Sequence, residues 1–128
     1  MGREALTANL RRYIVQVGMG VDQHGQDMNR AAQKAVADAI ARSCLTGLIE
    51  IIGLRDPNDM LVHVKVACPY PEQVDREAVL ATLPFGQRQL EVVAGGMTAS
   101  TVVQPELGDK NDQMLVATAA VTVWVPAL

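Results

Sequence analysis

Aromatic side chains are scarce in this sequence. Trp, Tyr and Phe account for only 3% of the 128 residues, although hydrophobic residues make up 49%. The core must therefore be built from aliphatic and small side chains, which lets neighbouring backbones approach closely. Basic residues are not in excess either, because the formal net charge is −3. An acidic chain of this kind offers no positive surface for nucleic acid or for an anionic membrane.

Cysteines are also few, and no apolar run is long. Cys44 and Cys68 lie far apart and outside any paired metal motif, which favours reduced thiols in the cytoplasm. No segment approaches the roughly 20 apolar residues of a membrane-spanning helix, and the first residues lack the apolar run of a signal peptide. We therefore expect one cytoplasmic domain over residues 1–128, with residues 1–10 loosely held.

Hydrophobic periodicity predicts a succession of strands and helices. Runs of β-forming residues predict strands at 12–17, 48–54, 61–68, 87–94 and 114–125. Apolar residues at three- and four-residue spacing predict helices at 27–43 and 75–83, the second capped by Asp75. A polar loop over 98–112 would precede the last strand.

The order β-α-β-β-α-β with an extra carboxyl-terminal strand predicts an α+β fold. Crossover handedness favours a ferredoxin-like or chorismate-mutase-like α/β sandwich, with one sheet and two helices on one face. Strands 12–17 and 61–68 would then be parallel neighbours at the centre. The uncovered face would carry polar residues among aliphatic ones: Gln16, Glu50, His63, Lys65, Gln89 and Glu91. Such a mixed face suits a subunit interface in a closed ring, and we expect a trimer.

The densest group of reactive residue types lies between the first strand and the first helix. It consists of three glycines, two carboxylates and one imidazole: Gly18, Gly20, Gly25, Asp22, Asp27 and His24. Glycines allow a ligand to approach the backbone, and the following helix offers free N–H groups to an anion. The aspartate and the histidine suit acid–base chemistry. The structural alternative is a tight turn in which Asp22 and Asp27 compete to cap the helix.

Two familiar kinds of site are disfavoured at this stretch. The third glycine is misplaced for a dinucleotide fingerprint, and no acidic residue ends a second parallel strand. The potential metal ligands Asp22, His24, Asp27 and His63 include no pair with the spacing of a zinc motif. We therefore predict neither a cofactor nor a metal site, with a mixed nitrogen–oxygen metal site as the less favoured alternative.

Lys65 is a candidate for a role in catalysis. It shares one side of the strand at 61–68 with His63. A half-buried lysine there could have a lowered pKa and act as a base or as the activator of a nucleophile. The alternative is an interface salt bridge with Glu50 or Glu91.

A second dense polar cluster precedes the last strand. Its sequence is Gly108-Asp109-Lys110-Asn111-Asp112. Turn chemistry alone can explain it. A last strand antiparallel to the first would, however, place Lys110 or Asp112 beside His24, and the Asp and Asn side chains would then bind the ligand. Gly95, Gly96 and Thr98 form another candidate backbone cradle, for which a flexible loop is the alternative.

At these residues the chain resembles a small family of conserved hypothetical proteins, the Lin family. Gly18-x-Gly20-x-Asp22-x-His24-Gly25 matches the signature of that family, and the block at 108–112 is similar to it as well. The similarity extends from about Arg11 to Val125. The resemblance implies no particular function.

A weaker resemblance is to one repeat of the cyanuric acid hydrolase and barbiturase family. Residues 62–69 resemble the strand that bears the lysine of those ring-opening amidohydrolases, and residues 94–98 resemble the segment that bears their serine. Lys65 lies two residues before the position of that lysine, and Ala94 stands where the serine would be. The serine mechanism therefore does not transfer. The resemblance implies an architecture, a homotrimer of single units with clefts between subunits.

The leading hypothesis is a homotrimer whose inter-subunit clefts bind a small polar or anionic ligand. A hydrolase or lyase acting there would use His24 as acid–base and Asp22 to orient it. Lys65 or Lys110 would stabilise developing negative charge. The competing hypothesis is a non-catalytic binding or scaffold protein, in which the same residues hold a turn and an interface.

Overall fold

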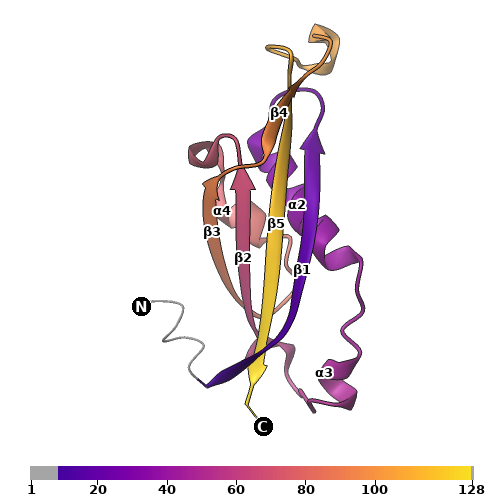
Figure 1. Ribbon diagram of the computed structural model, residues 1–128, viewed down its shortest axis with the longest axis vertical. Coiled ribbons are helices and arrows are strands. Elements are labelled where there is room, and N and C mark those ends of the chain that lie inside the picture. Colours follow the sequence, from indigo (N-terminus) through magenta and orange to yellow (C-terminus); the bar gives the residue numbers. More distant parts are fainter. Residues whose placement is uncertain (1–8, 128) are drawn as a thin grey trace.

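The computed structural model describes residues 9–127, which form one sheet with helices on one face (Figure 1). The strands are β1 (Leu10–Asp22), β2 (Leu61–Cys68), β3 (Gln87–Ala94), β4 (Met97–Ser100) and β5 (Gln113–Pro126). The helices are α2 (Met28–Ala41), α3 (Gly47–Glu50) and α4 (Arg76–Leu80). This arrangement confirms the α+β class. None of the helices within residues 9–127 has the length and apolar character needed to cross a membrane.

Most predicted elements are present. Both predicted helices form, the second only over Arg76–Leu80, and in each the aspartate before the helix accepts a hydrogen bond from the first turn. The strands predicted at 61–68 and 87–94 have those bounds. The predicted loop at 98–112 overlaps the short strand β4, which begins at Met97 and pairs with β5. Of the segment expected to be loose, residues 1–8 lie outside the described residues, and Leu10 already begins β1.

The order of the strands differs from the expected one. The sheet runs β1-β5-β2-β3, with β4 also paired to β5. β5 is antiparallel to both β1 and β2, whereas β2 and β3 are parallel. The prediction that the strands at 12–17 and 61–68 are neighbours is therefore wrong. β5 separates them because, at 14 residues, it is the longest strand and forms hydrogen bonds along both of its edges.

The strand predicted at 48–54 does not exist. Its first residues form the single helical turn α3, in which Leu48 is buried while Ile49 and Ile51 are exposed. Gly53 then adopts a left-handed φ of 76°, and the Leu54 N–H donates to the Leu48 carbonyl at 2.8 Å. The β-branched isoleucines suggested a strand, but the glycine closes a helical turn instead.

Helix α2 covers β1 at very short range. Its buried face is mostly alanine, and Gly18 and Gly20 lie beneath it. Gln16 is on the same helix-covered face, so the prediction that it lies on the uncovered face is wrong. Val15, Val17 and Met19 point to the uncovered face instead. The glycines decide this orientation because only a surface without side chains admits the helix backbone.

The outer edge of β1 is also protected by α2. The Asp38 carboxylate accepts from the Met19 N–H at 2.9 Å, and the Lys34 ammonium donates to the Val21 carbonyl at 2.9 Å. The Met19 N–H and the Arg42 guanidinium both lower the pKa of Asp38. These contacts occupy backbone groups that would otherwise be open to another strand.

Candidate functional site

The two polar segments singled out in the sequence meet at one end of the sheet. β1 and β5 pair antiparallel, with Asp22 opposite Leu115. The turn after β1 (residues 23–27) and the loop before β5 (residues 101–112) therefore lie together, at the upper end of Figure 1. The conditional prediction that the last strand is antiparallel to the first is confirmed.

Asp109 is the centre of this cluster. Its side chain is fully buried, and its two oxygens accept four hydrogen bonds from residues that follow β1 and precede β5. The donors are His24 Nδ1 at 2.8 Å, the Gly25 N–H at 2.9 Å, the Gln26 amide at 3.0 Å and the Gln104 N–H at 2.9 Å. The His24 hydrogen bond and then the Gln104 N–H hold the pKa of Asp109 well below its usual range.

Of the two ring nitrogens of His24, Nδ1 is held by a hydrogen bond within residues 9–127 and Nε2 is not. Nδ1 lies 2.8 Å from Asp109 Oδ2, and the imidazole side chain is 27% exposed. An ionised carboxylate can only accept, so Nδ1 carries the proton and Nε2 is the acceptor of the neutral ring. This arrangement gives the histidine a defined tautomer and orientation.

Gln26 joins the turn to the loop and was not predicted. Its Nε2 donates to the Gln113 carbonyl at 2.8 Å as well as to Asp109, and its Oε1 accepts from the Lys110 N–H at 2.9 Å. Its φ of 51° is left-handed, unusual for a residue other than glycine. A single sequence carries no signal for this role, because a glutamine beside a glycine looks like any polar turn residue.

Asp22 and Asp27 hold the start of α2. Asp22 Oδ2 accepts from the Asp27 N–H at 2.8 Å, and Asp27 Oδ1 accepts from the Asn29 N–H at 3.0 Å and the Arg30 N–H at 3.4 Å. Asp27 thus fills the place that a bound anion would take at this helix end. The residue that orients His24 is Asp109, not Asp22, which corrects the predicted pairing.

The glycines of the first stretch have different roles. A Cβ on Gly18 would lie 2.3 Å from the Ala39 nitrogen, and one on Gly20 would lie 2.2 Å from the Ala31 oxygen. The space in front of both is filled by α2, so neither can cradle a ligand there. Gly25 alone lies in the turn, with a φ of 96°.

The second predicted cradle is filled by the sheet. A Cβ on Gly95 would lie 2.8 Å from the Ala67 Cβ, and one on Gly96 would lie 2.1 Å from the Val116 oxygen. Thr98 belongs to β4, opposite Leu115. These residues form a tight connection between β3 and β4, and neither a cradle nor an unpaired loop is found.

The other candidates in the loop at 108–112 lie close to the turn that bears His24, but their hydrogen bonds stabilise the loop and the turn themselves. Asn111 Oδ1 accepts from the Gln113 N–H at 2.8 Å, and Asp112 Oδ2 accepts from the Ser100 hydroxyl at 2.7 Å. Lys110 is exposed and contributes only its backbone N–H to the cluster.

Lys65 lies elsewhere, on the uncovered face of the sheet. It is opposite Ala120 of β5, which is in turn opposite Val17, five residues before the end of β1. Its ammonium lies 4.0 Å from a Glu91 carboxylate oxygen, and both side chains are about half exposed. This contact corresponds to the salt bridge with Glu91 that the sequence analysis named as the alternative to a catalytic role for Lys65. Across residues 9–127 no three His, Cys, Asp or Glu side chains are grouped as metal ligands.

Fold and cluster together define a class of small α+β protein with one mixed sheet and, where β1 and β5 meet, a partly exposed histidine held by a buried aspartate. The chain belongs to a family of conserved hypothetical proteins, the Lin0512 family, which matches residues 12–123. Among solved structures it is similar to a crystal structure from Nostoc punctiforme, described as an FtsZ-like protein of unknown function. The two share 52% identity with a TM-score of 0.84, over 92% of this chain and 98% of that one. No curated protein matches the sequence.

Proposed function

We propose that this protein is a homotrimer in which His24 is the acid–base group for a small polar or anionic ligand bound in a cleft between subunits. The observation that carries the proposal is the hydrogen bond from His24 Nδ1 to the buried Asp109 carboxylate, in a ring that is still 27% exposed. The reaction would be a hydrolysis or an elimination, related to ring opening by the cyanuric acid hydrolases and barbiturases.

The chemistry follows from the geometry of the pair. A buried carboxylate fixes the imidazole tautomer and stabilises the imidazolium that forms when Nε2 takes a proton. A positioned base of this kind contributes about 10²- to 10⁴-fold to a rate. Lys110, next to Asp109 in the chain and exposed, supplies positive charge near an anionic ligand.

The proposal of self-association rests on the uncovered face of the sheet. Val15, Val17 and Met19 are 50%, 61% and 51% exposed, and they stand side by side along β1. Small residues of β5 lie beside them, since Val17 is opposite Ala120. Exposed aliphatic groups in one row favour burial against another copy. Lys65 and Glu91 on the same face offer charges of both signs to that copy.

A second candidate function has its own support. Asp109 takes two backbone N–H groups, from Gly25 and Gln104, in addition to two side chains. These four hydrogen bonds hold the loop before β5 against the turn after β1, and they do so whether or not the protein is a catalyst. In a non-catalytic binding or scaffold protein, the His24 hydrogen bond would have only this structural role.

The variant His24→Asn separates the two functions. An asparagine amide can donate to Asp109 as Nδ1 does, but it has no counterpart of Nε2. The comparison variant His24→Ala removes both the donor to Asp109 and the Nε2 acceptor. Assembly would be followed by light scattering, stability by urea unfolding, and binding by calorimetry with cyanuric acid, barbituric acid and orthophosphate as probes.

The proposed site requires that His24→Asn keeps the trimer and its stability but loses binding, and loses any ring opening of the first two probes. A scaffold role requires instead that the wild-type protein binds none of the three probes and that His24→Ala dissociates or unfolds it. The second pair of results would contradict the proposal.

A further inference from the structure

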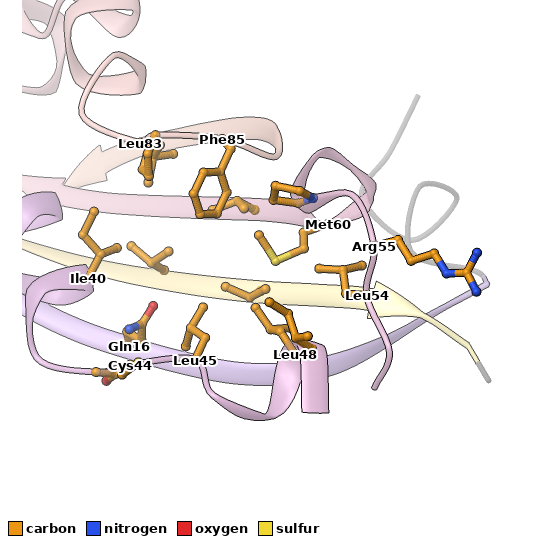
Figure 2. A pocket seen from close by; sticks show the side chains of 17 residues that line it. Gln16, Ile40, Cys44, Leu45, Leu48, Leu54, Arg55, Met60, Leu83 and Phe85 are labelled. Carbon is orange, nitrogen blue, oxygen red and sulfur yellow. The ribbon is translucent and has the colours of Figure 1, made fainter. Parts of the chain in front are cut away.

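A cavity lies at the end of the sheet opposite the Asp–His pair. It has a volume of about 490 Å³ and lies between the helix-covered face of the sheet, the chain around α3 and the loop before β3 (Figure 2). Most of its lining is aliphatic or aromatic, including Ile40, Leu45, Leu48, Met60, Leu83 and Phe85. Small-molecule sites typically have this size and this apolar character.

One polar side chain in this cavity has no partner. Gln16 is only 6% exposed, and its amide makes no hydrogen bond with any residue from 9 to 127. In Figure 2 it stands in the same cavity as Ile40 and Leu45. Among residues 9–127, the fully buried side-chain nitrogen or oxygen without a partner is Trp124 Nε1, so the Gln16 amide atoms reach the cavity, where water or a ligand completes their hydrogen bonds. Gln16 can both donate and accept.

The lining also indicates the charge of the ligand. Arg55 is the charged residue among those that line the cavity, and it is exposed at the outer end. Figure 2 shows its guanidinium directed away from the interior. An ionised group inside would therefore be buried without a counter-ion, which is strongly unfavourable.

We propose that this cavity binds a neutral, mainly apolar small molecule that presents one amide, lactam or hydroxyl group to Gln16. The site is separate from His24. Gln16 is opposite Val121 and Asp22 is opposite Leu115, which places the two sites roughly 20 Å apart along β1. The proposal does not depend on the function of the Asp–His pair.

The test uses the fluorescent probe N-phenyl-1-naphthylamine, which is neutral and apolar, and its displacement by octanamide. Gln16→Leu keeps the volume of the side chain and removes the amide. Ile40→Trp fills the cavity from α2. Gln89→Leu makes the same exchange as the first variant on β3, outside the cavity lining. Urea unfolding of each variant establishes that it is folded.

We expect the wild-type protein to bind the probe and octanamide to displace it. Gln16→Leu should still bind the probe but bind octanamide about tenfold more weakly, as the loss of a hydrogen-bonding group predicts. Ile40→Trp should bind neither, and Gln89→Leu should match the wild type. The proposal is overturned if the probe does not bind, if Gln16→Leu binds octanamide as tightly as the wild type, or if binding falls as protein concentration rises. The last result would assign the cavity to a second copy of the chain.

Discussion

Gly18→Ala tests whether the first glycines of the motif serve helix packing. The new Cβ would lie 2.3 Å from the Ala39 nitrogen, 2.7 Å from the Ala35 oxygen and 2.8 Å from the Ala39 Cα. All three are backbone atoms of α2, so no side chain can turn away. An ordinary contact of 3.4 Å requires the helix to move off by roughly 1 Å, along a face that is otherwise fully packed. Overpacking of this kind should cost about 3 kcal/mol of unfolding free energy.

Urea unfolding, followed by circular dichroism, measures this loss. Gly53→Ala is the control, because its Cβ would meet nothing within 4 Å and only the left-handed φ of 76° opposes it. That strain should cost about 1 kcal/mol. Shortening the neighbour in Gly18→Ala/Ala39→Gly should not restore stability, since the clash is with backbone. If Gly18→Ala lost binding of the three probes while its unfolding free energy stayed unchanged, the packing role would be refuted. Gly18 would then belong to the ligand site.

Two further predictions concern the loop and the open sheet face. Asp109 has a lowered pKa in the folded protein, so its contribution to stability is complete above the unfolded value of about 3.9 and is lost as pH falls further. Unfolding free energy should therefore fall below about pH 4, and less steeply in Asp109→Asn, whereas an unchanged acid slope would contradict the assigned hydrogen bonds. Val17→Glu should give a folded monomer by light scattering, because Val17 is 61% exposed and only assembly buries it. Val102→Glu, at a position 71% exposed, is the control that should leave assembly intact, and a Val17→Glu protein of unchanged mass would rule out this face as the interface.

Local structure was predictable here because it depends on short patterns. The alanine-rich spacing of α2, the cap at Asp27 and the alternation of β2 each need only neighbouring residues. The order of the strands was not predictable from such patterns. Whether the strand at 61–68 pairs with β1 or with β5 depends on hydrogen bonds between distant segments, which short patterns do not record.

The faces of β1 were misassigned for a related reason. Hydrophobicity places valines inside and glutamine outside, but the two glycines reverse this preference by admitting α2. Gln16 was therefore expected at a subunit interface and is found in a cavity.

The candidate site was predictable as a meeting of two segments, but not in its pairing. Turn chemistry marks the block at 108–112, and an antiparallel last strand brings it to His24. Which aspartate faces the imidazole depends on the exact path of the loop, in which Gly108 adopts a φ of 89° just before Asp109. Asp22, nearer in sequence, is directed to the helix instead.

The proposed role of His24 requires that the ring presents Nε2 to a ligand while Asp109 holds Nδ1. Nitrogen-15 NMR of protein labelled at histidine, assigned with His24→Asn, measures both ring nitrogens directly. We expect a proton on Nδ1 of the neutral ring, an unprotonated Nε2, and a shift of the Nε2 resonance when cyanuric acid, barbituric acid or orthophosphate binds. A neutral ring protonated on Nε2, or an Nε2 resonance that none of the three probes changes, would contradict it.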